Sequence, residues 1–177
     1  MRRTAGGAMS SPAPALLQPW QACEFESLLR TCLDENTTNQ GQVATFAETG
    51  FTHSRYGLRL TLPTGAEVYL QIVAARPPDG RAEPQGVPPP RLRAGTLPAV
   101  GKTPLTAVER HLIGGLTARQ DPFIRWVEPL SAANGAIPYG LHVTFHCGAA
   151  VCCYVAYVVP AGYSRPLGGP YPALRQV

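Results

Sequence analysis

Residues 56–77 read YGLRLTLPTGAEVYLQIVAARP, and residues 139–160 read YGLHVTFHCGAAVCCYVAYVVP. At an offset of 83 residues, eight of these 22 aligned positions are identical, where chance gives about two for residue types this common. In both stretches apolar and polar residues alternate on either side of a Gly-Ala pair. Alternation with a period of two predicts strands with one buried face. Each stretch therefore predicts a β-hairpin.

The same offset aligns two upstream segments that have the spacing of amphipathic helices. Their apolar stripes are Phe25, Leu28, Leu29 and Cys32 in the first segment and Leu105, Val108, Leu112 and Leu116 in the second. We expect the second helix to begin with Thr103 as N-cap and Pro104 as its first residue. Thr106 and Glu109 have the spacing of a capping box. A further strand is expected after each helix, over residues 43–48 and 123–127.

The sequence therefore predicts an α+β fold made by tandem duplication of a unit that contains a helix and a three-stranded antiparallel sheet. Units of about 55 residues bury little surface alone, so we expect the two to pack as an intramolecular pseudo-dimer. This leaves open one continuous sheet or two packed sheets. The expected segments are an N-terminal arm (1–18), a first repeat (19–75), a proline-rich linker (76–103), a second repeat (104–160) and an irregular tail (161–177).

Composition argues against three classes of protein: nucleic-acid-binding, secreted and disulfide-bonded, and membrane-spanning. The net charge is +4, but the basic residues are scattered and Lys102 is the only lysine, which is not the clustered pattern of a nucleic-acid-binding face. The five cysteines are odd in number and lack CxxC spacing, unlike a secreted disulfide framework. There is no signal-peptide pattern and no apolar stretch of membrane-spanning length. We therefore expect a cytoplasmic protein with no membrane partner.

Histidine and cysteine gather in the second repeat, at His142, His146, Cys147, Cys152 and Cys153. Residues four apart on a strand lie ~13 Å apart, so His142 and His146 do not share a metal ion. If Phe145 pairs with Val151, both histidines lie diagonal to Cys152. A thiol with an imidazole base is then conceivable.

The first repeat argues against chemistry at these positions. Arg59, Pro63 and Tyr69 stand where the second repeat has His142, His146 and Cys152, so no catalytic group is duplicated. We predict no catalytic residue, no metal and no cofactor. Trp126 is expected to be a core or interface anchor, and the matched pair Glu48 and Glu128 to lie at strand ends.

These observations favour a non-enzymatic interaction or regulatory protein that binds a protein partner or a further copy of itself. One alternative is a nucleic-acid-binding regulator that uses aromatic residues of the sheet face. Another is a Cys/His-dependent enzyme or metal-binding protein. The candidate binding residues are Arg59, Tyr69, His142, His146, Cys152 and Tyr154.

Overall fold

The computed structural model describes residues 22–36, 41–76, 86–133 and 135–164. Its helices are α1 (Ala22–Asn36), α2 (Phe46–Thr49), α3 (Leu105–Ala118) and the 3₁₀ turn η1 (Leu130–Ala132). Its strands are β1 (Gln42–Thr45), β2 (Gly57–Thr61), β3 (Glu67–Arg76), β4 (Ile124–Pro129), β5 (Gly140–Phe145) and β6 (Ala150–Val159). Among these described elements, no helix has the length and apolar character needed to cross a bilayer.

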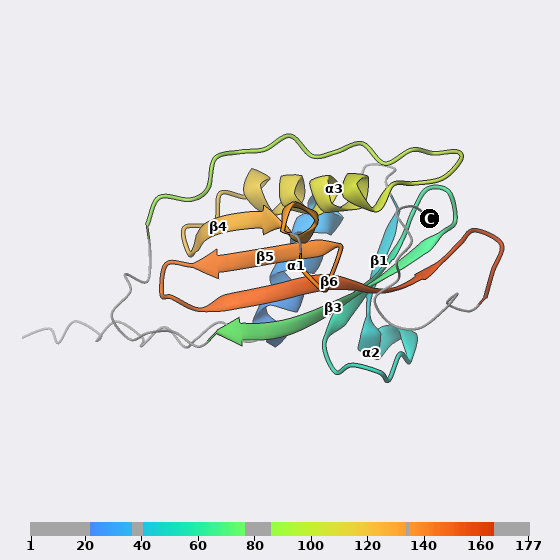
Figure 1. Ribbon diagram of the computed structural model, residues 1–177, viewed down its shortest axis with the longest axis horizontal. Helices are drawn as coiled ribbons and strands as arrows, with labels where there is room; N and C mark the ends of the chain where they lie inside the picture. The colour runs from blue at the N-terminus through green and yellow to red at the C-terminus, as the bar shows by residue number, and fades with distance from the viewer. Residues whose placement is uncertain (1–21, 37–40, 77–85, 134, 165–177) are drawn as a thin grey trace, which may run out of the picture.

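The fold is α+β, with one continuous six-stranded antiparallel sheet in the order β1-β2-β3-β6-β5-β4. Of the two arrangements left open by the sequence, the single sheet is the one observed. The long strands β3 and β6 pair at its centre. In Figure 1, α1 lies behind the strands and α3 runs along the β4 side. We call the sheet surface opposite the helices the open face.

The core lies between the sheet and the two long helices. Alternate side chains of the inner strands point into it and are at most 2% exposed: Leu58, Leu60, Val68, Leu70, Ile72, Leu141, Val143, Val151, Cys153 and Val155. The helix stripes close it, and Phe25 of α1 meets Phe145 of β5 edge-to-face with ring centroids 6.3 Å apart. The predicted alternation and both helix stripes therefore correspond to buried residues.

Two carboxylates tie the helices to the starts of β2 and β5. Glu26 of α1 accepts a hydrogen bond from the Gly57 amide at 2.6 Å, and Glu109 of α3 accepts one from the Gly140 amide at 2.8 Å. Glycine is required at both donor positions, Gly57 and Gly140, because an added Cβ would lie 2.3 Å from a carbonyl oxygen of the neighbouring strand. Glutamate and glycine are each displaced by 83 residues between the two contacts.

The predicted start of the second helix is wrong. Pro104 is the N-cap of α3 and makes no side-chain capping bond, while Thr103 is buried before it. Glu109 does not form a box with Thr106, because its carboxylate turns inward to Ser131 and Gly140. Glu109 therefore does not cap the helix in the way that the local spacing predicts, but is buried with its carboxylate hydrogen-bonded to Ser131 and Gly140.

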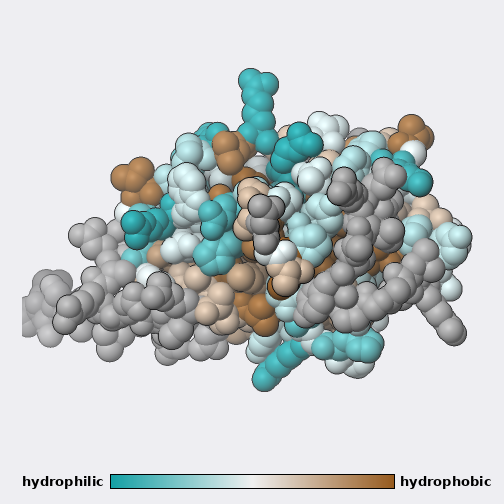
Figure 2. Space-filling view, in the orientation of Figure 1, coloured by the Kyte–Doolittle hydropathy of each residue, from teal (hydrophilic) through white to brown (hydrophobic). Residues whose placement is uncertain are grey.

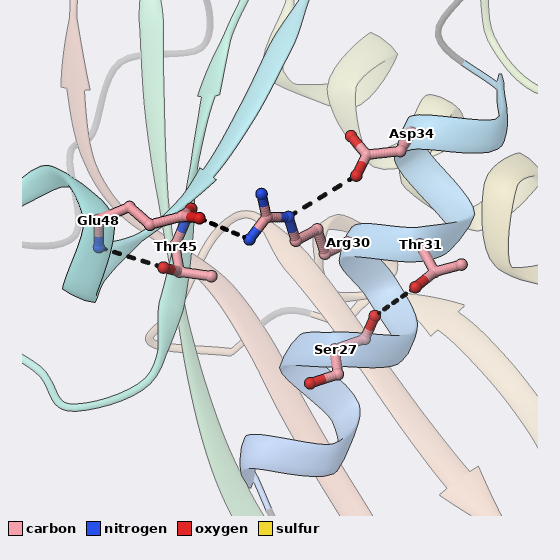
Figure 3. A network of polar contacts seen from close by, with 6 residues as sticks. All are labelled: Ser27, Arg30, Thr31, Asp34, Thr45 and Glu48. Carbon is pink, nitrogen blue, oxygen red and sulfur yellow. Dashed lines mark hydrogen bonds and ion pairs between the residues drawn. The ribbon is translucent and has the colours of Figure 1, made fainter.

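The first predicted strand also ends early, because a capping box lies within it. Thr45 accepts a hydrogen bond from the Glu48 amide, and the Glu48 carboxylate accepts one from the Thr45 amide. This box starts the short helix α2 directly after β1. Arg30 of α1 reaches Glu48 at 2.8 Å and Asp34 at 3.7 Å (Figure 3). The Thr45 amide and Arg30 hold the pKa of Glu48 below its ordinary value.

The described part of the linker, residues 86–103, packs along α3. It contains neither helix nor strand, and Figure 1 shows it running the length of α3. The Leu92 amide donates to Thr117 Oγ1, Gly95 O contacts His111 Nδ1 at 3.1 Å, and Leu97 is 4% exposed. Polar contacts and burial therefore fix this segment against the helix.

Candidate functional site

Five of the six candidate binding residues lie on the open face. Three cross-strand pairs place them there: Arg59 with Tyr69, Gln71 with Tyr154, and His142 with Cys152. In antiparallel strands, directly paired side chains share one face. His146 lies apart, in the turn after β5, where its Nε2 contacts the Val87 carbonyl at 3.1 Å.

The register of the second hairpin differs from the one expected. Val143 pairs with Val151 and Thr144 with Ala150, so His142 stands directly opposite Cys152 rather than diagonal to it. The turn is tighter than predicted, because the Phe145 amide bonds Ala149 O and the Gly148 amide bonds Phe145 O. On the other side of His142, Oε1 of Glu128 in β4 lies 3.2 Å from its Nδ1, within hydrogen-bonding distance.

Glu128, His142 and Cys152 thus form a carboxylate–imidazole–thiol row across three strands. A nucleophilic cysteine needs a depressed pKa, but partial burial raises the pKa of the Cys152 thiol. Within the described residues no group of His, Cys, Asp and Glu is arranged to hold a metal ion. The row therefore has the order of a catalytic triad without an activated thiol.

An aromatic pocket of about 250 Å³ lies on the open face, where the loop after α2 meets β3 and β6. We call it the aromatic pocket; its lining residues are Gly50, Phe51, Thr52, His53, Tyr69 and Tyr157. The Phe51 ring lies 4.9 Å from that of Tyr69 and 5.7 Å from that of Tyr157, and His53 lies 5.7 Å from Tyr157. Helix α2 supports it through Phe46, whose ring lies 4.4 Å from that of Phe51.

A polar network borders the aromatic pocket. Glu67 accepts a hydrogen bond from the Tyr69 hydroxyl at 2.9 Å and pairs with Arg59 at 3.4 Å. Burial, together with the bond to Glu67, raises the pKa of Tyr69 above its ordinary value. The Arg59 Nε is buried and has no hydrogen-bond partner among the described groups. Both oxygens of Glu67 are therefore engaged, and Arg59 keeps one free donor.

Other open-face positions differ in their access to solvent. Tyr154 is only 6% exposed, so its ring is not an accessible stacking surface. Trp126, expected in the core or an interface, is 53% exposed, which excludes the core. Its partner across the strands is Thr144, which places it on the open face. Figure 2, in the same view, shows apolar surface among polar side chains on this side.

The sequence reasoning missed Phe51, His53 and Tyr157. Counting by twos from Cys152 places Tyr157 in the core, but Leu70 pairs with Val155 and Tyr69 with Tyr157. The intervening Ala156 is a bulge residue that shifts the alternation by one. The sequence does contain an indication of Phe51 and His53 as site residues, because two ring-bearing side chains lie in a loop, where polar residues are usual.

Comparison with protein-family models, with curated proteins and with solved structures finds no match to this chain.

Proposed function

We propose that this chain is a non-enzymatic interaction or regulatory protein that binds a protein partner through the open face. The observation that carries the proposal is the aromatic pocket, which lies on the sheet surface that the helices leave uncovered. Exposed apolar side chains on the same face, Val73 at 37% and Trp126 at 53%, extend the surface. Aromatic and apolar anchors of this kind dominate protein interfaces.

We further propose that the scaffold arose by tandem duplication and packs as an intramolecular pseudo-dimer. The strand order supports this, because β1, β2 and β3 lie opposite β4, β5 and β6 about the central pair. Backbone hydrogen bonds recur at the offset of 83: Ile72 N to Tyr56 O, and Val155 N to Tyr139 O. Gly65 and Gly148 share a φ of 82° in equivalent turns. The proposed repeats keep the boundaries 19–75 and 104–160.

The two alternatives have less support. A nucleic-acid-binding sheet would use Tyr154 as a platform, but that ring is buried. An enzyme would use Cys152 with His142, but burial raises the pKa of this thiol. We also propose a reducing compartment such as the cytoplasm, because the five cysteines are odd in number and lack CxxC spacing.

Site-specific photocrosslinking tests the proposed function. A benzophenone amino acid at Val73 sits on the open face, and one at the exposed Arg110 of α3 is the matched control. We expect a saturable crosslinked protein from the Val73 variant alone, in lysate of the cells that make this chain. A crosslinked dimer of the purified protein would identify the partner as a second copy. Equal crosslinking from both positions, or none, contradicts the proposal.

A further inference from the structure

We propose a second binding surface, on the helix side of the sheet, that binds the phosphate backbone of a nucleic-acid duplex. Residues 86–103 and the helix α3 on which they pack make this surface, and we call it the strap surface. Its contacts are to phosphate groups, which double-stranded DNA and RNA share. This inference goes beyond the proposed function, because it uses neither the aromatic pocket nor the open face.

The fold brings the basic residues of the strap surface into one line. Residues 86–103 run along α3 in the direction opposite to the helix (Figure 1). Three hydrogen bonds set their register: Gln120 with the Pro89 carbonyl at 2.8 Å, Thr117 Oγ1 with the Leu92 amide at 3.1 Å, and the Arg110 carbonyl with the Gly95 amide at 3.4 Å. Arg91 and Arg93 flank the contact at Thr117, and Thr117 and Arg110 are two turns of helix apart, which is about 11 Å. Lys102, just before the N-cap of α3, extends the line to the start of the helix.

No exposed carboxylate within residues 86–118 offsets this positive charge. Their single acidic residue is Glu109, which is 1% exposed and turns its carboxylate to Ser131 and Gly140. Four cations are exposed and form no ion pair with a carboxylate of the described residues: Arg91, Arg93, Lys102 and Arg110. Basic residues that are scattered along the sequence are therefore gathered by packing on α3, which is the electrostatic pattern of nucleic-acid binding.

The residue types of the strap surface favour a duplex over other anionic partners. A duplex carries one negative charge per about 1.7 Å of its axis, whereas an extended acidic peptide carries at most one per about 3.3 Å. Three of the four cations are arginines, whose planar guanidinium group binds phosphate through two hydrogen bonds. Residues 86–118 include no Phe, Tyr or Trp, the side chains on which single-stranded bases stack. At the Lys102 end, the N-terminus of α3 adds the positive end of a helix dipole.

Fluorescence anisotropy with the full chain tests this inference. Labelled mixed-sequence DNA and RNA duplexes of about 20 base pairs are titrated at salt concentrations from about 50 to about 200 mM. One variant combines Arg91→Gln with Arg93→Gln, and a second carries Arg110→Gln. The matched controls are Leu92→Ala, an uncharged side chain between the two arginines, and Arg55→Gln, an exposed arginine in the loop after α2. Unlabelled poly-L-glutamate of equal total charge is the competitor.

We expect binding of at least one duplex, weakened on the order of 100-fold between the two salt concentrations, because about four cations contact phosphate. The double variant should lower the slope of log affinity against log salt by about 1.8, and Arg110→Gln by about 0.9. Both controls should keep the slope within about 0.3 of the original, and poly-L-glutamate should compete at least about tenfold less well than unlabelled duplex. Binding of either duplex with these slopes supports the inference, and the two titrations show which nucleic acid is bound.

Four outcomes would overturn the inference. They are no binding of either duplex at the lowest salt concentration, slopes that the arginine variants leave unchanged, an equal loss of affinity in either control, and equal competition by poly-L-glutamate. The last would make an acidic protein the partner of the strap surface. None of them affects the proposed function, which crosslinking at Val73 on the open face decides separately.

Discussion

Glu109 offers the sharpest stability test, because its carboxylate is buried and no basic group among the described residues pairs with it. The side chain is 1% exposed and accepts hydrogen bonds from the Ser131 amide at 3.1 Å, from the Ser131 hydroxyl, and from the buried Gly140 amide at 2.8 Å. Hydrogen bonds to a charged group contribute about 1.5–3 kcal/mol each, and a buried donor left without a partner costs about 1–3 kcal/mol. Since the three bonds share one carboxylate, we expect Glu109→Ala to lower the free energy of unfolding by about 3–5 kcal/mol.

Urea denaturation followed by circular dichroism measures this loss, with Glu109→Gln and Glu26→Ala as comparison variants. The amide oxygen of glutamine keeps an acceptor for Gly140, so Glu109→Gln should cost about 1–2 kcal/mol. Glu26 is partly exposed and bonds the Gly57 amide, so its removal should cost about 1–2 kcal/mol. If Glu109→Ala costs less than about 1 kcal/mol, or less than Glu26→Ala does, the reasoning from burial and shared hydrogen bonds is wrong.

Three further predictions concern the linker segment, a buried histidine and the thiols. An added Cβ at Gly114 would lie 2.1 Å from Ala94 Cα, so Gly114→Val should cost about 1–3 kcal/mol in urea denaturation; an unchanged midpoint would show that residues 86–103 do not pack on α3. Burial lowers the pKa of His111 below its ordinary value of 6.5, so the unfolded chain binds more protons than the folded one as pH falls. Stability should therefore decrease below about pH 6.5, and less steeply in His111→Gln; parallel pH profiles of the two proteins would refute this. Burial also raises the pKa values of Cys152 and Cys153, so iodoacetamide at neutral pH should label Cys153 only after unfolding and Cys152 slowly. Rapid alkylation of Cys152, read by mass spectrometry, would instead favour the enzyme alternative.

The sequence predicts the elements of this fold well where periodicity and turn chemistry agree. Alternation around Gly65 and Gly148 identifies both hairpins, and the apolar stripes identify α1 and α3. Core positions follow from the same patterns, because one face of each strand is buried. Cys153, which lies between the core residues Val151 and Val155 in this alternation, is fully buried.

Local spacing does not predict a capping box correctly when the side chain bonds a residue far away in the sequence. Thr106 and Glu109 have capping-box spacing, yet the Glu109 carboxylate accepts a hydrogen bond from the amide of Gly140, 31 residues away. The box at Thr45 and Glu48 is real and ends the first strand. Two segments with the same T-x-x-E spacing thus differ in structure, because Thr45 is the N-cap of α2 whereas Thr106 lies inside α3.

The candidate site is predictable only in part, for geometric reasons. The open face of β2, β3 and β5 follows from alternation, so Arg59, Tyr69 and His142 fall on it as expected. The bulge at Ala156 moves Tyr157 onto the same face, and a bulge has no reliable signal in one sequence. The pocket arises from that shift together with the loop that folds Phe51 back over the sheet.

Amide chemical shifts of the full chain, recorded with and without the partner protein identified by crosslinking at Val73, test whether the partner binds at the aromatic pocket. We expect the largest shifts at residues 50–53, at Tyr69 and at Tyr157, with α1 and α3 unaffected. Shifts concentrated on the helices, or on residues 126–128 and 142–152 with none around the aromatic pocket, would contradict it.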